Sequence, residues 1–357
     1  MPTIDVGGVE KNFILISNFL AQNLGKVTIV TTSYNLKNVF RKNIKFASYK
    51  NIDIKLIPRR IKFLIALIIL FIELLKNKNN LVFSFQANFY CILLCKLLRT
   101  KVIIRSNTSP TGWSSNIVKK KLYKYTLYLA DIVLANSMKF KKILNDEFGI
   151  KAICIYNPLN IKEIIKKSKK KIKIPFFSKS SINFINVARL EDQKDQFTLI
   201  KAFKKINNHI KFKLLIIGEG KNKRKLNHLI NKYKLTNSIK ILNFKKNPYP
   251  YIKKSDVFIL SSIYEGLPNV LLEALALNKF IISSNCPTGP SEILDNGKGG
   301  LLFKMKNSDD LKKKILFYFR NKKICFKKIK YANKRLSRFD YNTNMNNYLK
   351  LVNSISF

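Results

Sequence analysis

The chain has 357 residues, of which 46 % are hydrophobic, so it can bury proper cores and is not wholly disordered. At about 150 residues per domain, this length predicts two domains. Lys and Arg number 68 against 20 Asp and Glu, which gives a formal net charge of +48. The charge favours an anionic partner (nucleic acid, an anionic membrane surface or a phosphorylated ligand), unless much of the lysine only solvates the surface. Composition alone leaves both interpretations open.

Cysteine and histidine usage narrows the chemistry. No CxxC pair occurs among the five cysteines, which favours a reducing cytosol over a disulfide framework or a structural zinc site. The only histidines, His209 and His228, lie in lysine-rich segments. A His-based metal centre is therefore not expected.

Short apolar, β-branched runs alternate with longer amphipathic stretches along the chain, which is typical of βαβ units and parallel sheets. The expected strands of the first half are Lys26–Thr32, Ile52–Ile57, Leu81–Phe85, Lys101–Arg105, Asp131–Ala135 and Ala152–Tyr156. Those of the second half are Ile182–Ala188, Lys213–Ile217, Ile239–Phe244, Val257–Leu260, Phe280–Ser283 and Leu301–Phe303.

Two segments bear on membranes. Met1–Asn12 is polar, so no signal peptide is expected. Phe63–Ile72 is apolar but shorter than the about 20 residues that span a bilayer. Because basic residues precede it from Arg59 onward, the expected helix lies either on an anionic membrane or against a parallel sheet.

Between the two series of strands runs a lysine-rich stretch, 161–175, bounded by Pro158 and Pro175. It predicts a basic linker between two doubly wound α/β domains, residues 1–160 and 176–334. In open parallel sheets, ligands bind beyond the carboxyl ends of the strands. Two such sheets facing each other would place their ligand loops on opposite walls of one cleft.

The segment Ser262–Ala274 carries the strongest signal. It follows an expected strand and contains a glycine for a tight turn and Pro268 where a helix would begin. The unpaired N–H groups and the positive end of such a helix form a natural seat for phosphate. Glu265 would precede this helix and Glu273 would lie within it, where a carboxylate can accept hydrogen bonds from two neighbouring sugar hydroxyls. The alternatives are a loop acid near the helix dipole for Glu265 and an exposed helical glutamate for Glu273.

Three further loops are candidates. Arg189 and Lys194 lie five residues apart after the strand that opens the second domain, so both could bind one diphosphate, Arg189 as a fork and Lys194 as a point charge. The pair Gly7-Gly8 precedes an amphipathic helix, where a ligand can approach backbone amides. Gly218-Glu219-Gly220 and the segment 287–292 could line a nucleotide, or be simple turns.

These residues resemble glycosyltransferase family 4, the retaining nucleotide-sugar enzymes of the GT-B fold. The resemblance covers nearly the whole chain and is most specific in Ser262-x-x-Glu265-Gly266-x-Pro268-x-x-x-x-Glu273-Ala274. Supporting matches are Gly7-Gly8-x-Glu10-Lys11, 130–137, 156–158, Arg189-Leu190-x-x-x-Lys194 and Gly218-x-Gly220. The family implies an α/β fold of two doubly wound Rossmann-like domains facing across a cleft. The acceptor side would then be 1–160, the nucleotide-sugar side 176–334, and the helix in 335–357 would cross back onto the first domain.

By that resemblance, the donor-binding residues are Gly7, Gly8, Arg189, Lys194, Gly218, Glu265, Gly266, Leu267, Pro268, Asn269, Val270 and Glu273. Arg189 and Lys194 would hold the donor diphosphate, and Glu273 the ribose hydroxyls. Glu265 would contact the transferred sugar, so the expected catalytic residues are Glu265, Arg189 and Lys194. Because Arg, Lys and a helix end stabilise the leaving nucleoside diphosphate, the family implies no metal and no cofactor.

Two features depart from the family. Many members carry a histidine after a middle strand of the first domain. The matching loop, 104–108, has none, so either Arg105 or Asn107 takes its place or the position is not used. The apolar first strand expected before Gly7 is also missing, which would leave a gap in the first sheet. We expect either that Met1 is not the native start or that this is a shortened copy.

The expected function is retaining transfer of a hexose to a lipid-linked or growing surface glycan, such as lipopolysaccharide. UDP-linked donors are favoured, with guanosine-linked mannose as the alternative. The enzyme would be cytoplasmic and peripheral at the inner face of the membrane, which the basic helix near residue 60 would dock. A non-catalytic nucleic-acid binder is less favoured, because the aromatic residues mostly fall in apolar elements, and no nucleic acid is expected. A GT-B nucleotide-sugar epimerase is also less favoured, because it would need titratable groups at the sugar and the expected cleft has no histidine.

Overall fold

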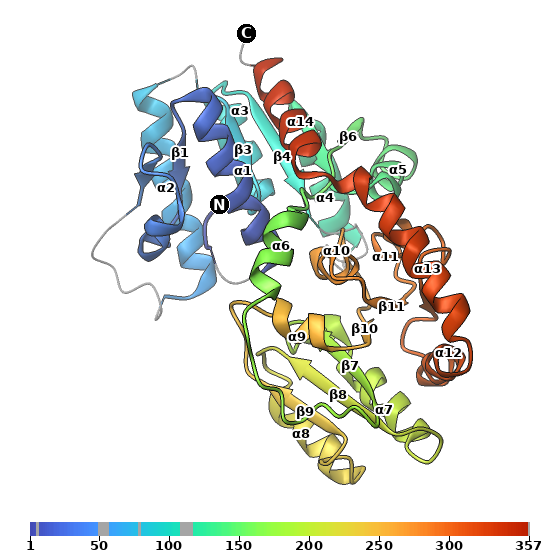
Figure 1. Cartoon of the computed structure of the whole chain (residues 1–357). Coiled ribbons are helices and arrows are strands. Elements are labelled where there is room, and N and C mark those ends of the chain that lie inside the picture. The colour runs from blue at the N-terminus through green and yellow to red at the C-terminus, as the bar shows by residue number, and fades with distance from the viewer. Residues whose placement is uncertain (5–6, 49–56, 78–79, 108–116, 356–357) are drawn as a thin grey trace. The chain divides into compact units, whose positions relative to one another are not determined.

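The computed structural model describes residues 1–357 apart from 5–6, 49–56, 78–79, 108–116 and 356–357. The chain divides into two compact units (Figure 1). Unit 1 comprises Met1–Pro158 and Tyr341–Phe357, and unit 2 comprises Leu159–Asp340. The expected strand Ile52–Ile57 lies almost wholly outside the described residues.

Unit 1 alternates helices and strands. Its elements are α1 (Gly8–Leu24), β1 (Thr28–Val30), η1 (Tyr34–Val39), β2 (Lys45–Ala47), α2 (Arg59–Lys76), β3 (Val82–Ser84), α3 (Asn88–Leu97), β4 (Val102–Ser106), α4 (Ile117–Tyr128), β5 (Ile132–Ala135), α5 (Met138–Asp146), β6 (Ala152–Cys154) and α14 (Tyr341–Asn353). The sequence did not indicate the short strand β2. Among the described residues the strands form two parallel sheets, β1-β2 and β3-β4-β5-β6.

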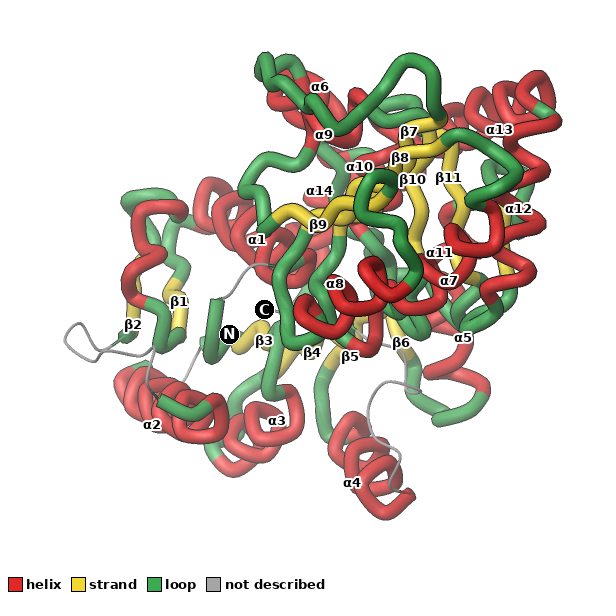
Figure 2. The backbone as a smooth tube through the Cα atoms, turned by 90° about the horizontal axis from the view of Figure 1, so that it is seen from below, coloured by secondary structure: helices red, strands yellow, loops and turns green. Residues whose placement is uncertain are grey.

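The larger sheet of unit 1 is covered on both faces, as the continuous apolar runs of parallel strands require. Side chains alternate along β4, so Ile103 packs in a core that includes residues of α1 and α14. Val102 and Ile104 point into a second core formed with α3 and α5, to which Leu74 of α2 belongs. Figure 2 shows α2, α3 and α4 on the same side of this sheet.

The terminal helix α14 belongs to unit 1, as the expected return of the chain requires. Its buried residues Met345 and Tyr348 lie in the same core as α1. The returning helix begins at Tyr341 rather than at 335, because 335–339 forms the short helix η5 within unit 2.

Unit 2 contains one parallel sheet in the order β12-β11-β10-β7-β8-β9. The strand order reverses between β7 and β10, which makes the sheet doubly wound. Its elements are α6 (Ile161–Ser168), β7 (Ile182–Val187), η4 (Asp192–Lys194), α7 (Gln196–Ile206), β8 (Phe212–Ile217), α8 (Lys223–Lys232), β9 (Ile239–Leu242), α9 (Tyr249–Lys254), β10 (Val257–Leu260), α10 (Asn269–Ala276), β11 (Phe280–Ser284), α11 (Pro290–Ile293), β12 (Leu301–Phe303), α12 (Ser308–Arg320), α13 (Lys322–Lys334) and η5 (Arg335–Phe339).

The expected linker 161–175 is only partly a linker, and this expectation is corrected. Residues 161–168 form helix α6, whose first turn is capped by the Asn160 side chain, which accepts a hydrogen bond from the Glu163 N–H at 3.0 Å. Ile164 is buried, and α6 packs against α9 and α10. Lys162, Lys166 and Lys167 lie on this amphipathic helix, whereas the lysines from Lys169 to Lys173 follow it.

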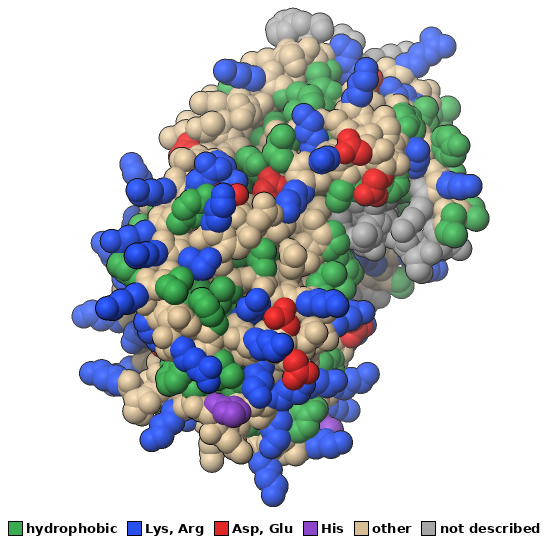
Figure 3. Space-filling model, turned by 90° about the vertical axis from the view of Figure 1, so that its right-hand side faces the viewer, with side chains coloured by type: hydrophobic (Ala, Val, Ile, Leu, Met, Phe, Trp, Pro, Cys, Tyr) green, Lys and Arg blue, Asp and Glu red, His purple; other side chains and the backbone are tan. Residues whose placement is uncertain are grey.

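The excess positive charge is widely distributed. Figure 3 shows Lys and Arg side chains scattered over the whole of one face of the molecule, with hydrophobic groups between them. Many lysines therefore solvate the surface rather than form one anion-binding patch. No helix in the described part of the chain combines the length and the apolar character needed to cross a membrane.

Candidate donor site

The candidate site lies in unit 2, at the carboxyl ends of β7, β8 and β10. Three loops meet there, and they begin at Ala188, Gly218 and Ser261. Backbone hydrogen bonds join the first two loops, because the Leu190 N–H donates to the Glu219 carbonyl oxygen at 2.7 Å. This is the edge of a parallel sheet at which ligands bind.

Gly218 and Gly220 are required by this close packing. A Cβ atom at Gly218 would lie 1.9 Å from the Ala188 carbonyl oxygen, which is backbone and cannot move aside cheaply. Gly220 has a φ of +152°, and a Cβ atom there would lie 2.4 Å from the Leu190 carbonyl oxygen. The two glycines therefore let the β8 loop lie directly on the loop that carries Arg189.

The positive charges of the site differ in their partners. Within the described chain, the Arg189 guanidinium has no hydrogen-bond or ion-pair partner, although the Arg189 carbonyl oxygen accepts from Gln196 Nε2 at 3.0 Å. Lys194 Nζ forms an ion pair with Glu265 Oε1 at 2.5 Å, and the exposed fractions of the two side chains are 15 % and 9 %. The structure thus joins Lys194 of one loop to Glu265 of another.

Further contacts fix that pairing. The Ile263 N–H donates to the Gln193 carbonyl oxygen at 2.8 Å, and the Ser261 hydroxyl donates to the Lys194 carbonyl oxygen at 2.7 Å.

Cys286 lies beside the Lys194–Glu265 pair and is buried. Burial, and then the negative charge of Glu265, raise the pKa of the Cys286 thiol to about 12. Cys286 is therefore a neutral, inert wall of the site.

Helix α10 begins where its sequence predicts. Pro268 is its N-cap residue with extended backbone, and the proline side chain makes no capping hydrogen bond. Gly289 packs behind this turn. Its φ is +81°, and a Cβ atom there would lie 2.3 Å from the Gly266 carbonyl oxygen, so this position requires glycine. The predicted residues Gly266, Leu267, Asn269 and Val270 form the turn and the first residues of α10, whose positive end suits an anion.

Glu273 lies in the second turn of α10 and is only 7 % exposed. The Tyr249 hydroxyl donates to its Oε1 atom at 3.2 Å. Sequence reasoning missed Tyr249, which begins α9 after the loop that follows β9. The rule that ligand loops follow strands could have found this loop, but its residues, Asn243–Pro248, matched no motif. Ser262 Oγ is also buried here and has no hydrogen-bond partner.

The predicted Gly7 and Gly8 belong to unit 1, where Gly7 is the N-cap residue of α1 and Gly8 its first residue. The unit 2 residues predicted as donor-binding are brought together, whereas these two are described only within their own unit.

Arg105 does not replace the histidine expected after the middle strand of the first domain. Its side chain is only 1 % exposed, and the guanidinium donates to Tyr348 Oη at 3.0 Å and to the Oδ1 atoms of Asn107 and Asn157. Asn107 is in turn held by its Nδ2 donating to the Phe85 carbonyl oxygen at 2.9 Å. Both residues therefore serve a buried polar cluster inside unit 1.

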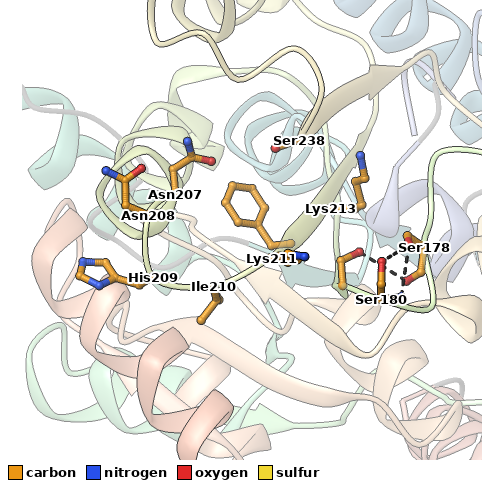
Figure 4. Close-up of a pocket in the computed structure, with 11 residues that line it drawn as sticks. Ser178, Ser180, Asn207, Asn208, His209, Ile210, Lys211, Lys213 and Ser238 are labelled. Atoms are coloured by element: carbon orange, nitrogen blue, oxygen red, sulfur yellow. Dashed lines mark hydrogen bonds between the residues drawn. The ribbon is translucent and has the colours of Figure 1, made fainter.

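Neither histidine takes part in the site. Among the residues that the structure places, no group of three or more His, Cys, Asp or Glu side chains could hold a metal ion. A cavity of about 440 Å³ at the amino ends of β7 and β8 is lined by His209, Lys211, Lys213, serines and asparagines (Figure 4). It lies at the opposite edge of the sheet from Arg189 and Glu265, and no acid lines it.

Two protein-family models match the chain, and each of them covers most of one unit. The model of "Glycosyl transferases group 1" matches residues 167–335, and that of "Glycosyltransferase Family 4" matches residues 6–163. An uncharacterized glycosyltransferase of Methanocaldococcus jannaschii is 31 % identical over 303 residues, which cover 81 % of this chain and 68 % of that protein. The chain belongs to glycosyltransferase family 4.

One further sequence and one solved structure are similar to this family-4 chain. A Campylobacter jejuni N-acetylgalactosamine-N,N'-diacetylbacillosaminyl-diphospho-undecaprenol 4-alpha-N-acetylgalactosaminyltransferase is 28 % identical over 232 residues, covering 62 % of each chain. The solved structure of Anabaena HepE in complex with UDP-glucose has a TM-score of 0.78 at 18 % identity and covers 99 % of this chain and 98 % of that one. This likeness confirms the GT-B fold, with a Rossmann-like domain in each unit.

Proposed function

We propose that this family-4 chain is a retaining glycosyltransferase that moves a hexose from a UDP-sugar to a lipid-linked glycan. The observation that carries the proposal is the convergence, at one sheet edge of unit 2, of Arg189, the Lys194–Glu265 ion pair, the start of α10 and the buried Glu273.

Each group supplies one part of donor binding. The Arg189 guanidinium binds two phosphate oxygens as a fork, and the amino end of α10 adds further N–H donors and a positive dipole end. Glu273, aimed by Tyr249, accepts hydrogen bonds from the two ribose hydroxyls. Glu265 contacts the hexose, so Lys194 exchanges part of its interaction with Glu265 for a diphosphate oxygen when the donor binds.

The same groups support catalysis. In the transfer, the bond between the sugar C1 and the diphosphate oxygen breaks, and the acceptor oxygen bonds to C1 from the same face. The acceptor proton passes to a donor phosphate oxygen, so the reaction needs no separate base. Arg189, Lys194 and the helix end stabilise the charge that develops on the leaving UDP, so no metal ion is required.

The donor and acceptor classes are taken from the named relatives. HepE of Anabaena binds UDP-glucose, and the Campylobacter jejuni enzyme is named for an acceptor linked to diphospho-undecaprenol. The chain spans only about three fifths of the latter protein. We propose UDP-hexose and a polyprenyl-diphosphate glycan for this chain, which places it in the cytoplasm at the inner face of the membrane. Its products would be surface polysaccharides such as lipopolysaccharide.

A thermal-shift panel of UDP, GDP, UDP-glucose, UDP-galactose, UDP-N-acetylglucosamine and GDP-mannose tests this proposal. UDP and one UDP-sugar should stabilise the protein most, and Glu273→Ala should abolish that preference. Glu147→Ala, which removes an exposed carboxylate of unit 1, is the matched control and should leave the ranking unchanged. A ranking led by GDP compounds, or one that survives Glu273→Ala, would contradict the assignment. NMR of the glycosidic product tests retention of the anomeric configuration.

A further inference from the structure

Exposed apolar side chains are concentrated on three helices of unit 1. Of the 23 large hydrophobic residues that are exposed among those described, 14 lie on α2, α3 and α4. They form what we call the three-helix surface: Ile61, Leu64, Ile68, Phe71, Ile72 and Leu75 of α2, Tyr90, Leu93 and Leu97 of α3, and Ile117, Val118, Leu122, Tyr125 and Tyr128 of α4. Exposed hydrophobic groups at this density mark an interaction site rather than ordinary surface.

Helix α2 has two apolar sides, and only one of them packs against the rest of unit 1. Leu74 is buried and Leu70 packs against the same core beneath the sheet. On the other side, the residues from Ile61 to Leu75 recur at intervals of three and four, so they form one continuous stripe along the helix. Leu64 is 59 % exposed in that stripe. A water-exposed surface helix would carry polar residues at these positions.

The stripe continues onto the neighbouring helices. Helix α3 contacts both α2 and α4, and Figure 2 shows all three on the same side of the β3-β4-β5-β6 sheet. The exposed residues of α3, Tyr90, Leu93 and Leu97, again recur at intervals of three and four, and Tyr125 of α4 is 68 % exposed. The three-helix surface is therefore contributed by three adjacent helices rather than by one.

The charges on these helices favour an anionic partner. The three helices carry nine Lys and Arg residues and one acid, Glu73. Hydrogen bonds from Lys45, and then from Lys76, hold the pKa of the Glu73 carboxyl below its usual value. Arg59 and Arg60 are exposed at the start of α2. Basic residues, tyrosines and aliphatic side chains on one face are the combination that inserts at the level of lipid headgroups.

We propose that the three-helix surface docks unit 1 onto an anionic lipid bilayer, with α2, α3 and α4 lying in the membrane interface. This inference rests on the proposed function and adds to it that the enzyme meets its acceptor at a membrane surface. The surface adds α3 and α4 to the basic α2 helix, which alone the sequence had indicated. Vesicle binding requires neither donor nor acceptor, so it can be tested apart from the proposed activity.

Co-sedimentation of the full chain with vesicles tests the apolar contribution. Vesicles of equal parts phosphatidylcholine and phosphatidylglycerol should bind the protein far better than phosphatidylcholine alone. The triple variant Leu64→Gln, Ile68→Gln, Phe71→Gln removes apolar contact without touching the core, and should lower the partition coefficient by on the order of tenfold or more. The matched control is Phe319→Gln, Ile324→Gln, Phe326→Gln, which removes three exposed hydrophobic residues of α12 and α13 and should leave binding unchanged.

A second pair of variants tests the charge. Arg59→Gln with Arg60→Gln should weaken binding to the anionic vesicles by roughly thirtyfold, from about 1 kcal/mol for each charge. Lys323→Gln with Lys327→Gln, which removes two exposed charges of α13, should have little effect. Stabilisation by UDP should be the same in all four variants.

Three outcomes would overturn the proposal. The first is vesicle binding by the α2 triple variant equal to that of the unaltered protein. The second is an equal loss in the control triple. The third is a dimer, seen by sedimentation without vesicles, that the α2 variant dissociates, because the surface would then join two copies of the chain. Loss of UDP stabilisation in all variants alike would instead concern the proposed function.

Discussion

Glu273 illustrates how single residues of the site are held. Its side chain is only 7 % exposed, and Tyr249 donates a hydrogen bond to the carboxylate from a different helix. In the proposed donor complex this carboxylate accepts two hydroxyl groups, and it gains from having its orientation fixed before the ligand arrives. On that proposal, Tyr249 is a positioning residue rather than a catalytic one.

Tyr249→Phe should weaken UDP binding by about 1 kcal/mol, a roughly fivefold rise in Kd, because it removes one hydrogen bond that orients Glu273. The kcat should change little, since the ribose is remote from the reacting carbon. The variant should also lose part of its preference for UDP over 2′-deoxy-UDP. Calorimetric titration with both ligands measures this. Tyr251→Phe in the same helix is the control, and an equal effect there would mean that α9 as a whole, not the Tyr249 hydroxyl, matters.

Asp195 gives a prediction on pH that follows from its setting. It has a φ of 45°, caps α7 by accepting from the Thr198 N–H at 3.2 Å, and has a buried Oδ2 atom without a partner. Burial raises the pKa of the Asp195 carboxyl above its ordinary value of 3.8. The folded state is therefore destabilised by the ionised form, and this penalty is present above the raised pKa and disappears as the pH falls below the unfolded value.

Asp195→Asn should consequently raise the Tm at pH 7.5, because the amide keeps the cap, suits the left-handed backbone and carries no charge. The gain should shrink toward zero near pH 4. Asp309→Asn is the matched control, since it removes one charge at an exposed position where Lys205 lowers the carboxyl pKa. Its effect should have the opposite sign at pH 7.5. A gain in both variants would point to the overall charge of the protein instead.

At the scale of elements, local sequence patterns predicted the strands and helices well, but they did not predict contacts between residues far apart in the chain. Strand β10 and helix α10 follow from an apolar run and from Pro268. The ion pair between Lys194 and Glu265, which lie 71 residues apart, was not predicted. Helix α6 was misread because its short lysine-rich segment hides Ile164. Nothing local in sequence shows that Arg105 bonds to Tyr348, which lies 243 residues further along the chain.

The Arg105 cluster anchors α14 to the rest of unit 1. The guanidinium is buried and donates to three neutral acceptors, the Asn107 and Asn157 side chains and the Tyr348 hydroxyl. Tyr348→Phe leaves the Arg105 Nε–H without an acceptor and should destabilise unit 1 by about 1–3 kcal/mol in chemical denaturation. Tyr318→Phe is the control, because the hydroxyl of this largely buried tyrosine of unit 2 makes no hydrogen bond within the described residues, and its removal should be close to neutral. Similar losses in both would remove any special role for the cluster.

At the scale of the whole molecule, the two units have separate hydrophobic cores. Each hydrophobic cluster described lies within one unit: one on a face of the unit 2 sheet, and two on the faces of the larger unit 1 sheet. The sequence predicted two doubly wound domains from strand spacing alone, because apolar runs record local burial. It ended the first domain at 160 and began the returning segment at 335, whereas the structure divides the chain after 158 and after 340, where the Leu159 N–H donates to the Phe339 carbonyl oxygen at 2.8 Å.

The proposed donor site, whose described residues lie in unit 2, predicts that the two units respond unequally to UDP. Scanning calorimetry should show two transitions, of which Tyr348→Phe lowers the one that belongs to unit 1. UDP at about 100 times its Kd adds about 2.7 kcal/mol to the state that binds it, which should raise the unit 2 transition by roughly 5–10 °C. The other transition should stay in place, and Glu273→Ala should remove the shift. Equal displacement of both transitions by UDP, or a single cooperative transition, would show that the nucleotide site and its stability are not confined to unit 2.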